Sequence, residues 1–200
     1  LIKVVHATGA ELGLAFDGKG TLYVADGVRG LLAIDTAGTV RVLADAADGS
    51  PVTFADDVDV AADGRVYFSD ASSKFGINAG VEDASVLDII EHGGHGRLLE
   101  FDPVTGRTTV LARGLNFANG VAVSHDEQSV LVSETGHYRV LRVRRDGPAR
   151  GEVSVMIEAL PGFPDNITRG TYGTYWIALF APRNRLLDRL AGWPALRKVI

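Results

Sequence analysis

Short apolar runs rich in Val, Ile, Leu and Tyr recur along the chain, and polar, glycine-containing turns separate them. Short runs of this kind, bounded by turn residues, are typical of β-strands. Four stretches align with one another, each as strand, turn and strand: 12–26, 56–70, 119–134 and 165–179. Their first residues are 44, 63 and 46 positions apart, and the longest interval holds an insertion at about 76–94. The chain is therefore expected to be an internal repeat of strand units.

Two more strand-like segments follow each of the first three pairs: 30–35 and 39–43, 96–102 and 107–111, 138–143 and 152–157. Four strands in about 45 residues are typical of one blade of a β-propeller. The pattern predicts a single all-β domain of about three and a half blades. The expected blade units and lid-like insertions are 10–44, 54–112, 117–158 and a partial unit at 163–200, with insertions at 76–94 and 183–200.

The composition narrows the classes of function. The 200 residues include 24 glycines and no cysteine, and the formal net charge is −5. The absence of cysteine excludes disulfide scaffolds and thiolate chemistry, and the mild acidity argues against nucleic-acid binding. No apolar run approaches the roughly 18 residues of a membrane helix. The compartment stays open, with the cytoplasm slightly favoured because no signal peptide is seen, although the sequence starts at Leu1.

The first strand of a propeller blade is innermost, so equivalent positions at its start are expected to converge on the central channel. These positions are Leu12, Asp56, Asn119 and Asp165. Two carboxylates that face one axis repel unless a positive charge lies between them, and hard divalent cations prefer oxygen ligands. A calcium-like ion explains this pattern. The alternative is that these side chains only satisfy turn amides at the strand ends.

Several motifs resemble the strictosidine synthase-like branch of the gluconolactonase and paraoxonase superfamily, over nearly the whole chain. They include Phe-Ala-Asp-Asp-Val-Asp-Val-Ala at 54–61, Phe-Ala-Asn-Gly-Val-Ala-Val-Ser at 117–124 and Leu-Pro-Gly-Phe-Pro-Asp-Asn-Ile at 160–167. The resemblance implies a six-bladed propeller whose central metal is bound by Asn119, Asp165 and Asn166. Asp56 stands where the family usually has asparagine, which adds a negative charge to the expected site.

The resemblance also implies a chemistry, which is metal-assisted hydrolysis of small lactones or aryl esters. The metal would polarise the carbonyl and a carboxylate would activate water. Asp165 is the first candidate for that carboxylate and Asp56 the second. His95, in the motif His92-Gly-Gly-His95, is a third catalytic candidate because imidazole titrates near neutral pH.

Two other functions remain open at this point. A strictosidine synthase-like enzyme that forms carbon–nitrogen bonds would need a glutamate of the last blade, which lies outside this sequence. A propeller without catalysis would serve as a binding module. The basic, amphipathic segment 183–200 could contact a membrane surface, but a lid over the pocket is the favoured interpretation. No Gly-x-Ser-x-Gly elbow, zinc-protease helix or phosphate-binding glycine loop appears.

Overall fold

The structure, a computed structural model, describes residues 11–77, 81–190 and 193. Its strands pair with their neighbours in sequence as antiparallel meanders, as the repeated strand units predict. There are three four-stranded sheets, a two-stranded sheet and a small hairpin among these residues. The strands are β1 (Glu11–Phe16), β2 (Leu22–Asp26), β3 (Gly30–Ile34), β4 (Val40–Ala44), β5 (Ala46–Ala47), β6 (Ser50–Pro51), β7 (Ala55–Val60), β8 (Val66–Asp70), β9 (Gly96–Asp102), β10 (Arg107–Leu115), β11 (Ala118–Val123), β12 (Ser129–Glu134), β13 (Arg139–Arg144), β14 (Val153–Ile157), β15 (Gly162–Arg169) and β16 (Tyr175–Pro182).

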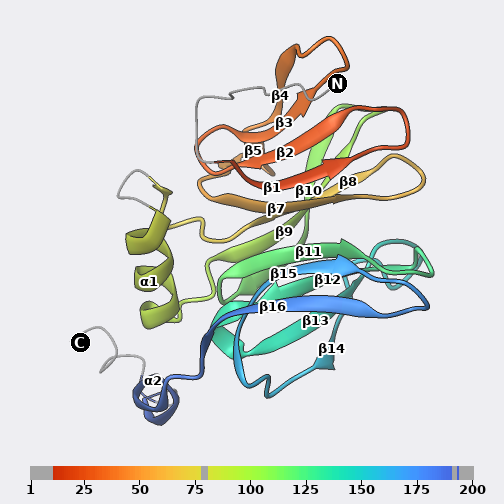
Figure 1. The fold of residues 1–200 in the computed structure, drawn as a ribbon. Helices are drawn as coiled ribbons and strands as arrows, with labels where there is room; N and C mark the ends of the chain where they lie inside the picture. Colours follow the sequence, from red (N-terminus) through yellow and green to blue (C-terminus); the bar gives the residue numbers. More distant parts are fainter. Residues whose placement is uncertain (1–10, 78–80, 191–192, 194–200) are drawn as a thin grey trace.

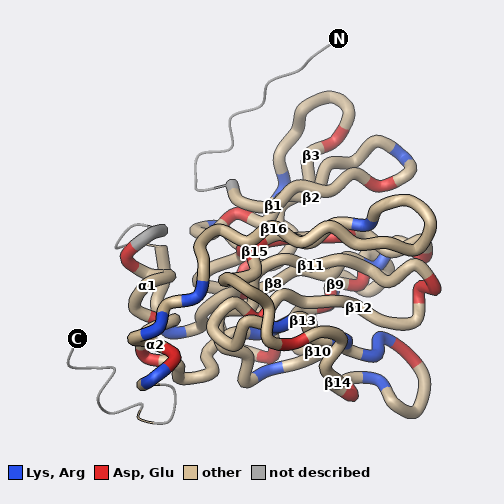
Figure 2. Tube along the Cα trace, turned by 60° about the horizontal axis from the view of Figure 1, so that its bottom comes forward, with Lys and Arg blue, Asp and Glu red and all other residues tan. Residues whose placement is uncertain are grey.

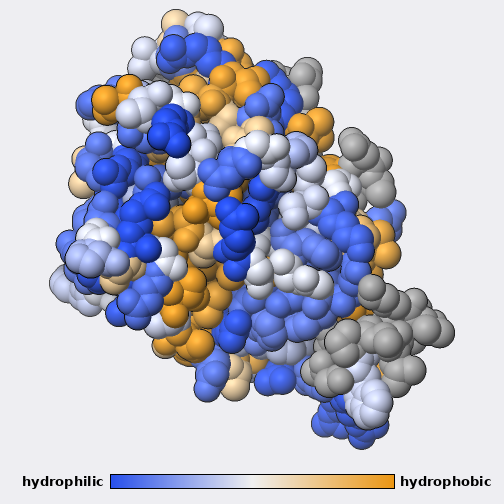
Figure 3. Space-filling view, turned by 180° about the vertical axis from the view of Figure 1, so that it is seen from behind, coloured by the Kyte–Doolittle hydropathy of each residue, from blue (hydrophilic) through white to orange (hydrophobic). Residues whose placement is uncertain are grey.

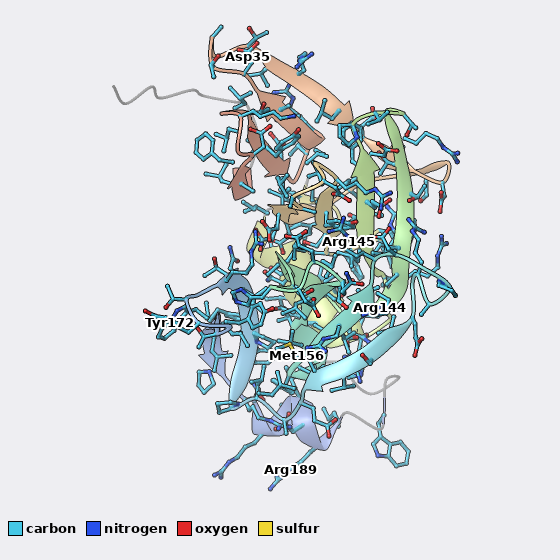
Figure 4. The ribbon with its side chains drawn as sticks, turned by 90° about the vertical axis from the view of Figure 1, so that its right-hand side faces the viewer. Asp35, Arg144, Arg145, Met156, Tyr172 and Arg189 are labelled. Atoms are coloured by element: carbon cyan, nitrogen blue, oxygen red, sulfur yellow. The ribbon has the colours of Figure 1, made fainter. Side chains whose placement is uncertain are left out.

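Each four-stranded sheet is one blade, and the β15–β16 pair is the start of a fourth. The first strands of successive blades, β1, β7, β11 and β15, contact one another in that order, so they are the inner strands. The blades are stacked from the β1–β4 sheet to the β15–β16 pair (Figure 1). From the side they form an arc, with β10 and β14 on its outer edge and β15–β16 facing away from them (Figure 4).

Hydrophobic side chains between the blades form the core. Leu31 and Phe68 belong to the cluster between the first two blades, and Leu98 and Val132 to the cluster between the second and third. All four are completely buried. At roughly 25 cal/mol per Å² of apolar surface removed from water, such burial is the main force that holds the blades together.

The outer side of the arc is less well covered. All five residues of β14 are exposed, and four of them are hydrophobic. A band of hydrophobic side chains between hydrophilic ones is visible from behind (Figure 3), and Met156 of β14 is labelled in Figure 4. Charged residues of both signs lie in the turns at the end of the sheets away from the helices (Figure 2).

The two helices lie at the same end of the sheets (Figure 1). Helix α1 (Val81–Glu91) lies between β8 and β9, within the lid-like insertion expected at 76–94. Helix α2 (Arg185–Arg189) is a short, exposed helix capped by Asn184. It forms part of the expected 183–200 segment, whose residues 191–192 and 194–200 lie outside the described residues. Neither described helix has the length and apolar character needed to span a membrane.

Candidate functional site

The inner strands are irregular near their start, where the repeat alignment places the candidate ligands. β7 shifts register against β8 between Ala55 and Val58, and β11 shifts against β12 between Ala118 and Val121. β1 and β15 contain similar shifts. Such β-bulges redirect side chains and are frequent beside functional sites. The residues inside these bulges are Leu12, Asp56, Asp57, Asn119, Gly120, Asp165 and Asn166.

The structure brings four of the expected ligands into one pocket of about 490 Å³. Asp56 comes from β7, Asn119 from β11, and Asp165 and Asn166 from β15. The fourth equivalent position, Leu12 of β1, lines the same pocket with a hydrocarbon side chain. The pocket therefore has oxygen-bearing side chains on three inner strands and an apolar one on the first.

Two glycines allow the inner strands to approach closely here. A Cβ atom on Gly120 would lie 2.5 Å from the backbone oxygen of Asp165 and from the backbone nitrogen of Ile167. A Cβ atom on Gly13 would lie 2.5 Å from Cα of Asp57. Because no side chain fits at these distances, glycine is required for the strands to lie this close. The polar side chains of neighbouring blades are thereby concentrated around one small volume.

The walls of the pocket are hydrophobic. Phe54 and Phe117 each precede a candidate ligand by two residues and meet edge to face, with ring centroids 5.4 Å apart. Helix α1 covers another side with Ser85, Val86 and Ile89. No cationic side chain occurs among the described residues that line the pocket. Its wall residues are Leu12, Phe54, Phe117, Phe180, Ser85, Val86 and Ile89.

The electrostatics of this region are unfavourable for two ionised carboxylates. Burial, and then the charges of Asp57 and Asp165, raise the pKa of Asp56 well above its usual range. Burial also raises the pKa of Asp57 to about 6, although hydrogen bonds from the amides of Val121 and Val58 oppose this effect. Asp56 lines the pocket, so a positive charge there would lower the cost of ionising it, whereas Asp57 lies outside the pocket lining.

The donor set fits a hard divalent cation in chemistry. The Oδ1 atom of Asn119 is buried and has no hydrogen-bond partner within the protein, which is costly for an amide oxygen unless a ligand satisfies it. Two carboxylates and two amides offer the oxygens that calcium prefers. No cluster of three or more histidine, aspartate or glutamate side chains with metal-binding geometry occurs in the described part of the chain. Any cation would thus depend on the asparagine oxygens as well.

A buried ion pair supports the segment that leads into β7. Asp70, at the end of β8, is fully buried, and its Oδ2 accepts hydrogen bonds from Nε and Nη2 of Arg97 at 2.9 and 2.5 Å. Its Oδ1 accepts from the backbone amides of Thr53 and Phe54. The carboxylate therefore fixes the backbone of Phe54, two residues before Asp56.

Glu134 has the same role in the third blade. It accepts hydrogen bonds from the amide of Asn116, from Nδ1 of His137 at 2.8 Å and from Nε of Arg139 at 2.5 Å. Burial alone would raise the pKa of Glu134, but the bonds from His137, Arg139 and Asn116 lower it to about 2. The group is ionised at neutral pH and holds the chain just before Phe117.

His95 does not line the pocket with the other candidates. It borders a separate groove that includes Arg97 and Arg113, and its Nε2 lies 3.6 Å from the carboxylate of Glu91. Its ring also meets that of Phe75 at a centroid distance of 6.2 Å. The structure thus brings Asp56, Asn119, Asp165 and Asn166 together without His95.

Sequence reasoning did not predict the supporting role of the acids at the ends of the second strands. It also did not predict which residues α1 contributes to the pocket. The first group had a detectable signal, because the aligned repeats end in Asp26, Asp70 and Glu134. The pocket-facing residues of α1 had none, since the position of a helix in an insertion depends on tertiary packing.

Comparison with known proteins agrees with this fold. Residues 56–147 match the family model described as strictosidine synthase. The chain is similar to the strictosidine synthase-like family. It is 40% identical to adipocyte plasma membrane-associated protein from Salmo salar, over 96% of this chain and 47% of that protein. It is 41% identical to the strictosidine synthase-like 10 protein of Arabidopsis thaliana, over 90% of this chain and 48% of that protein. The chain spans about half the length of these curated relatives.

Solved structures extend the similarity to β-propellers of the gluconolactonase type. A gluconolactonase from Xanthomonas campestris is similar with a TM-score of 0.70 and 22% identity, over 88% of this chain and 58% of that one. The calcium-binding protein regucalcin from Agrobacterium tumefaciens is similar with a TM-score of 0.59 and 20% identity, over 83% and 52% of the respective chains. The predicted propeller fold is therefore confirmed for this partial ring.

Proposed function

We propose that the protein is a metal-dependent hydrolase of small lactones or aryl esters, with a calcium-like cation held by Asp56, Asn119, Asp165 and Asn166. The observation that carries the proposal is their convergence from three bulged inner strands on one pocket, together with the unsatisfied Oδ1 of Asn119. The gluconolactonase and the calcium-binding regucalcin among the similar structures support it. When bound, the cation would supply Lewis-acid polarisation of the substrate carbonyl.

The side chains of this chain would do the remaining work. Asp165 is the first candidate to accept a proton from the attacking water, because it lines the pocket and is only partly buried. Asp56 is more deeply buried than Asp165, so its carboxylate is better suited to hold the cation than to exchange protons with solvent. The proposed chemistry rests on these two carboxylates without His95.

The walls define the kind of substrate. Phe54, Phe117, Ile89 and Leu12 offer an apolar surface for an aryl or alkyl group beside the oxygen-bearing side chains. Since no cationic side chain lies among the described lining residues, a neutral ester or lactone is favoured over an anionic one. The hydrophobic walls would also exclude water other than the reacting molecule.

Hydrolysis by the full-length protein tests this proposal. Phenyl acetate and a neutral alkyl lactone are assayed with calcium and after its removal by a chelator. We expect the chelator to abolish turnover and Asp165→Asn to lower kcat by about 10²–10⁴-fold, the usual contribution of a general base. Asp102→Asn, in the exposed β9–β10 turn, is the matched control and should leave kcat unchanged. Turnover that is indifferent to calcium would contradict the proposal, and calcium binding without any turnover would favour the binding-module alternative.

The family match favours a second candidate, which is a strictosidine synthase-like carbon–nitrogen condensation. The aromatic walls suit a substrate with a flat ring as well as they suit an aryl ester. This activity would persist after chelation, so the same assay with an aryl-ethylamine and an aldehyde separates the two functions.

A further inference from the structure

The C-terminal end of α1 meets the third blade through two histidines. His92 follows the helix directly, and its Nε2 lies 3.0 Å from Nε2 of His137. The rings are nearly perpendicular, with centroids 4.4 Å apart. His137 ends the short 3₁₀ turn between β12 and β13. The contact therefore joins the helix that covers the pocket to the blade that carries Asn119.

Glu134 sets the protons of this pair. Two groups lie close to Nδ1 of His137, namely Glu134 Oε1 at 2.8 Å and the amide nitrogen of Asn116 at 3.1 Å. Because the ionised carboxylate can only accept and makes the shorter contact, we assign the hydrogen to Nδ1 of His137, and Arg139 also donates to Glu134. Nε2 of a neutral His137 is then an acceptor for the N–H of His92. When one proton is added, the hydrogen bond between His92 and His137 is kept if the two rings exchange the roles of donor and acceptor. When both rings are protonated, two N–H groups face each other, the hydrogen bond is lost and the like charges repel.

The backbone at His92 is left-handed, which is uncommon outside glycine although histidine adopts it more often than most residues. Its φ of 55° lies in the left-handed region, which glycine occupies at lower cost, although Gly93 and Gly94 follow immediately. Non-glycine residues in this region cluster where the surrounding structure uses their side chains. The contact with His137 is such a use.

We propose that His92 and His137 form a proton-sensitive latch that holds the end of α1 against the third blade at neutral pH. Protonation of both rings releases that end of the helix and widens the pocket bordered by Ser85, Val86 and Ile89. Imidazole is the side chain that changes charge between about pH 5 and 8, so the latch is tested at pH 7.5 and 5.5. The closed state binds one proton fewer than the open state, so acidification shifts the balance toward the open state. The latch concerns access to the pocket and does not depend on the proposed hydrolysis.

On acidification, the other charged groups around α1 either strengthen its attachment to the protein or leave it unchanged. Lys74 and Glu91 form an ion pair at 2.6 Å that involves neither histidine of the latch. Burial raises the pKa of Asp88 to about 6, so the folded helix binds this proton more readily than an unfolded chain does, and acidification stabilises it. Protonation of His95 adds attraction to Glu91. Loosening of α1 by acid must therefore come from the histidine pair.

Amide hydrogen exchange of the full-length protein tests the latch. Protection of residues 85–91 is measured at pH 7.5 and 5.5 after correction for intrinsic exchange rates, with β12 as the internal reference. We expect protection of the helix to fall at least tenfold at pH 5.5 while that of β12 stays within twofold. Unchanged helix protection, or an equal loss in β12, would overturn the proposal.

A matched pair of variants makes the test specific. The amide nitrogen of glutamine can take the place of imidazole Nε2 without titrating, so in His92→Gln helix protection should change by less than twofold between the two pH values. In His125→Gln, which removes a histidine bonded to the carbonyl of Thr174 on the fourth blade, the wild-type response should persist. If His92→Gln loosens on acidification as much as the wild type, the latch is wrong.

Discussion

The first blade differs from the second and third in the pocket and in the support behind it. Its innermost pocket residue is Leu12, and the acid that ends its second strand, Asp26, is used locally. Asp26 Oδ1 accepts the amides of Val28 at 3.0 Å and Arg29 at 2.9 Å in the next turn. The residue opposite Asp26 is Gly30, which offers no charge.

In the second and third blades the equivalent acids are paired with arginines, and they also bind backbone amides outside their own turn. Asp70 stands opposite Arg97 and Glu134 opposite Arg139. Each acid also accepts an amide from the segment before its inner strand. A buried ion pair gains little net stability because both charges lose their hydration. In the second and third blades the pair lies behind Asp56 and Asn119, and it is absent beside Leu12, so we interpret it as positioning those two residues.

The largest expected effect comes from removing the arginine of one pair. Arg97→Met leaves Asp70 buried without its counter-charge, and we expect the free energy of unfolding to fall by about 3–5 kcal/mol. Urea unfolding of the full-length protein measures this.

The first blade supplies the matched control for that variant. Asp26→Asn keeps the oxygen that accepts the turn amides, so its cost should stay within about 1 kcal/mol. The double variant Asp70→Asn/Arg97→Met should recover part of the loss, because no uncompensated charge remains. If Arg97→Met and Asp26→Asn lower the free energy of unfolding equally, the proposed difference between the first and second blades is wrong.

A smaller effect on the free energy of unfolding is expected from substituting Asp56 in the pocket. Because the folded state raises the pKa of Asp56, this group binds its proton more tightly in the native protein than in the unfolded chain. Its contribution to stability is therefore lost as the pH rises from about 4 through the raised value. Without calcium, Asp56→Asn should stabilise the protein by about 1–3 kcal/mol at pH 7.5 and hardly at all at pH 4.

Thermal or urea unfolding with a chelator present, at both pH values, checks this prediction. The same substitution in the exposed turn residue Asp35 should show no such pH-dependent gain, because that carboxyl is hydrogen-bonded by turn amides. A gain of equal size at pH 4 and pH 7.5 would mean that charge at Asp56 is not the cause.

The sequence predicted the blades because short apolar runs are separated by turn residues and their repeats align. It also placed Asp56, Asn119 and Asp165 at one level of the inner strands, since equivalent repeat positions occupy equivalent places. It did not predict the bulges, which arise when neighbouring strands pack closely at Gly13 and Gly120. Register shifts of this kind depend on contacts between blades that local patterns do not encode.

His95 and α1 show the other limit. The spacing of the two histidines in the insertion drew attention to His95, but its ring faces Glu91 and Phe75. The partner of His92 is His137, which lies 45 residues away in sequence and on another blade. Only the packing of the helix against the third blade brings these two rings together.

The central claim is that oxygen donors from three blades share one cation, and calcium titration of the full-length protein by calorimetry tests it most directly. The account predicts one calcium ion per chain at this site and a dissociation constant at least tenfold higher in Asn119→Leu. Asp102→Asn, outside the pocket, should bind as the wild type does. Undiminished binding in Asn119→Leu, or no binding in the wild type, would contradict it.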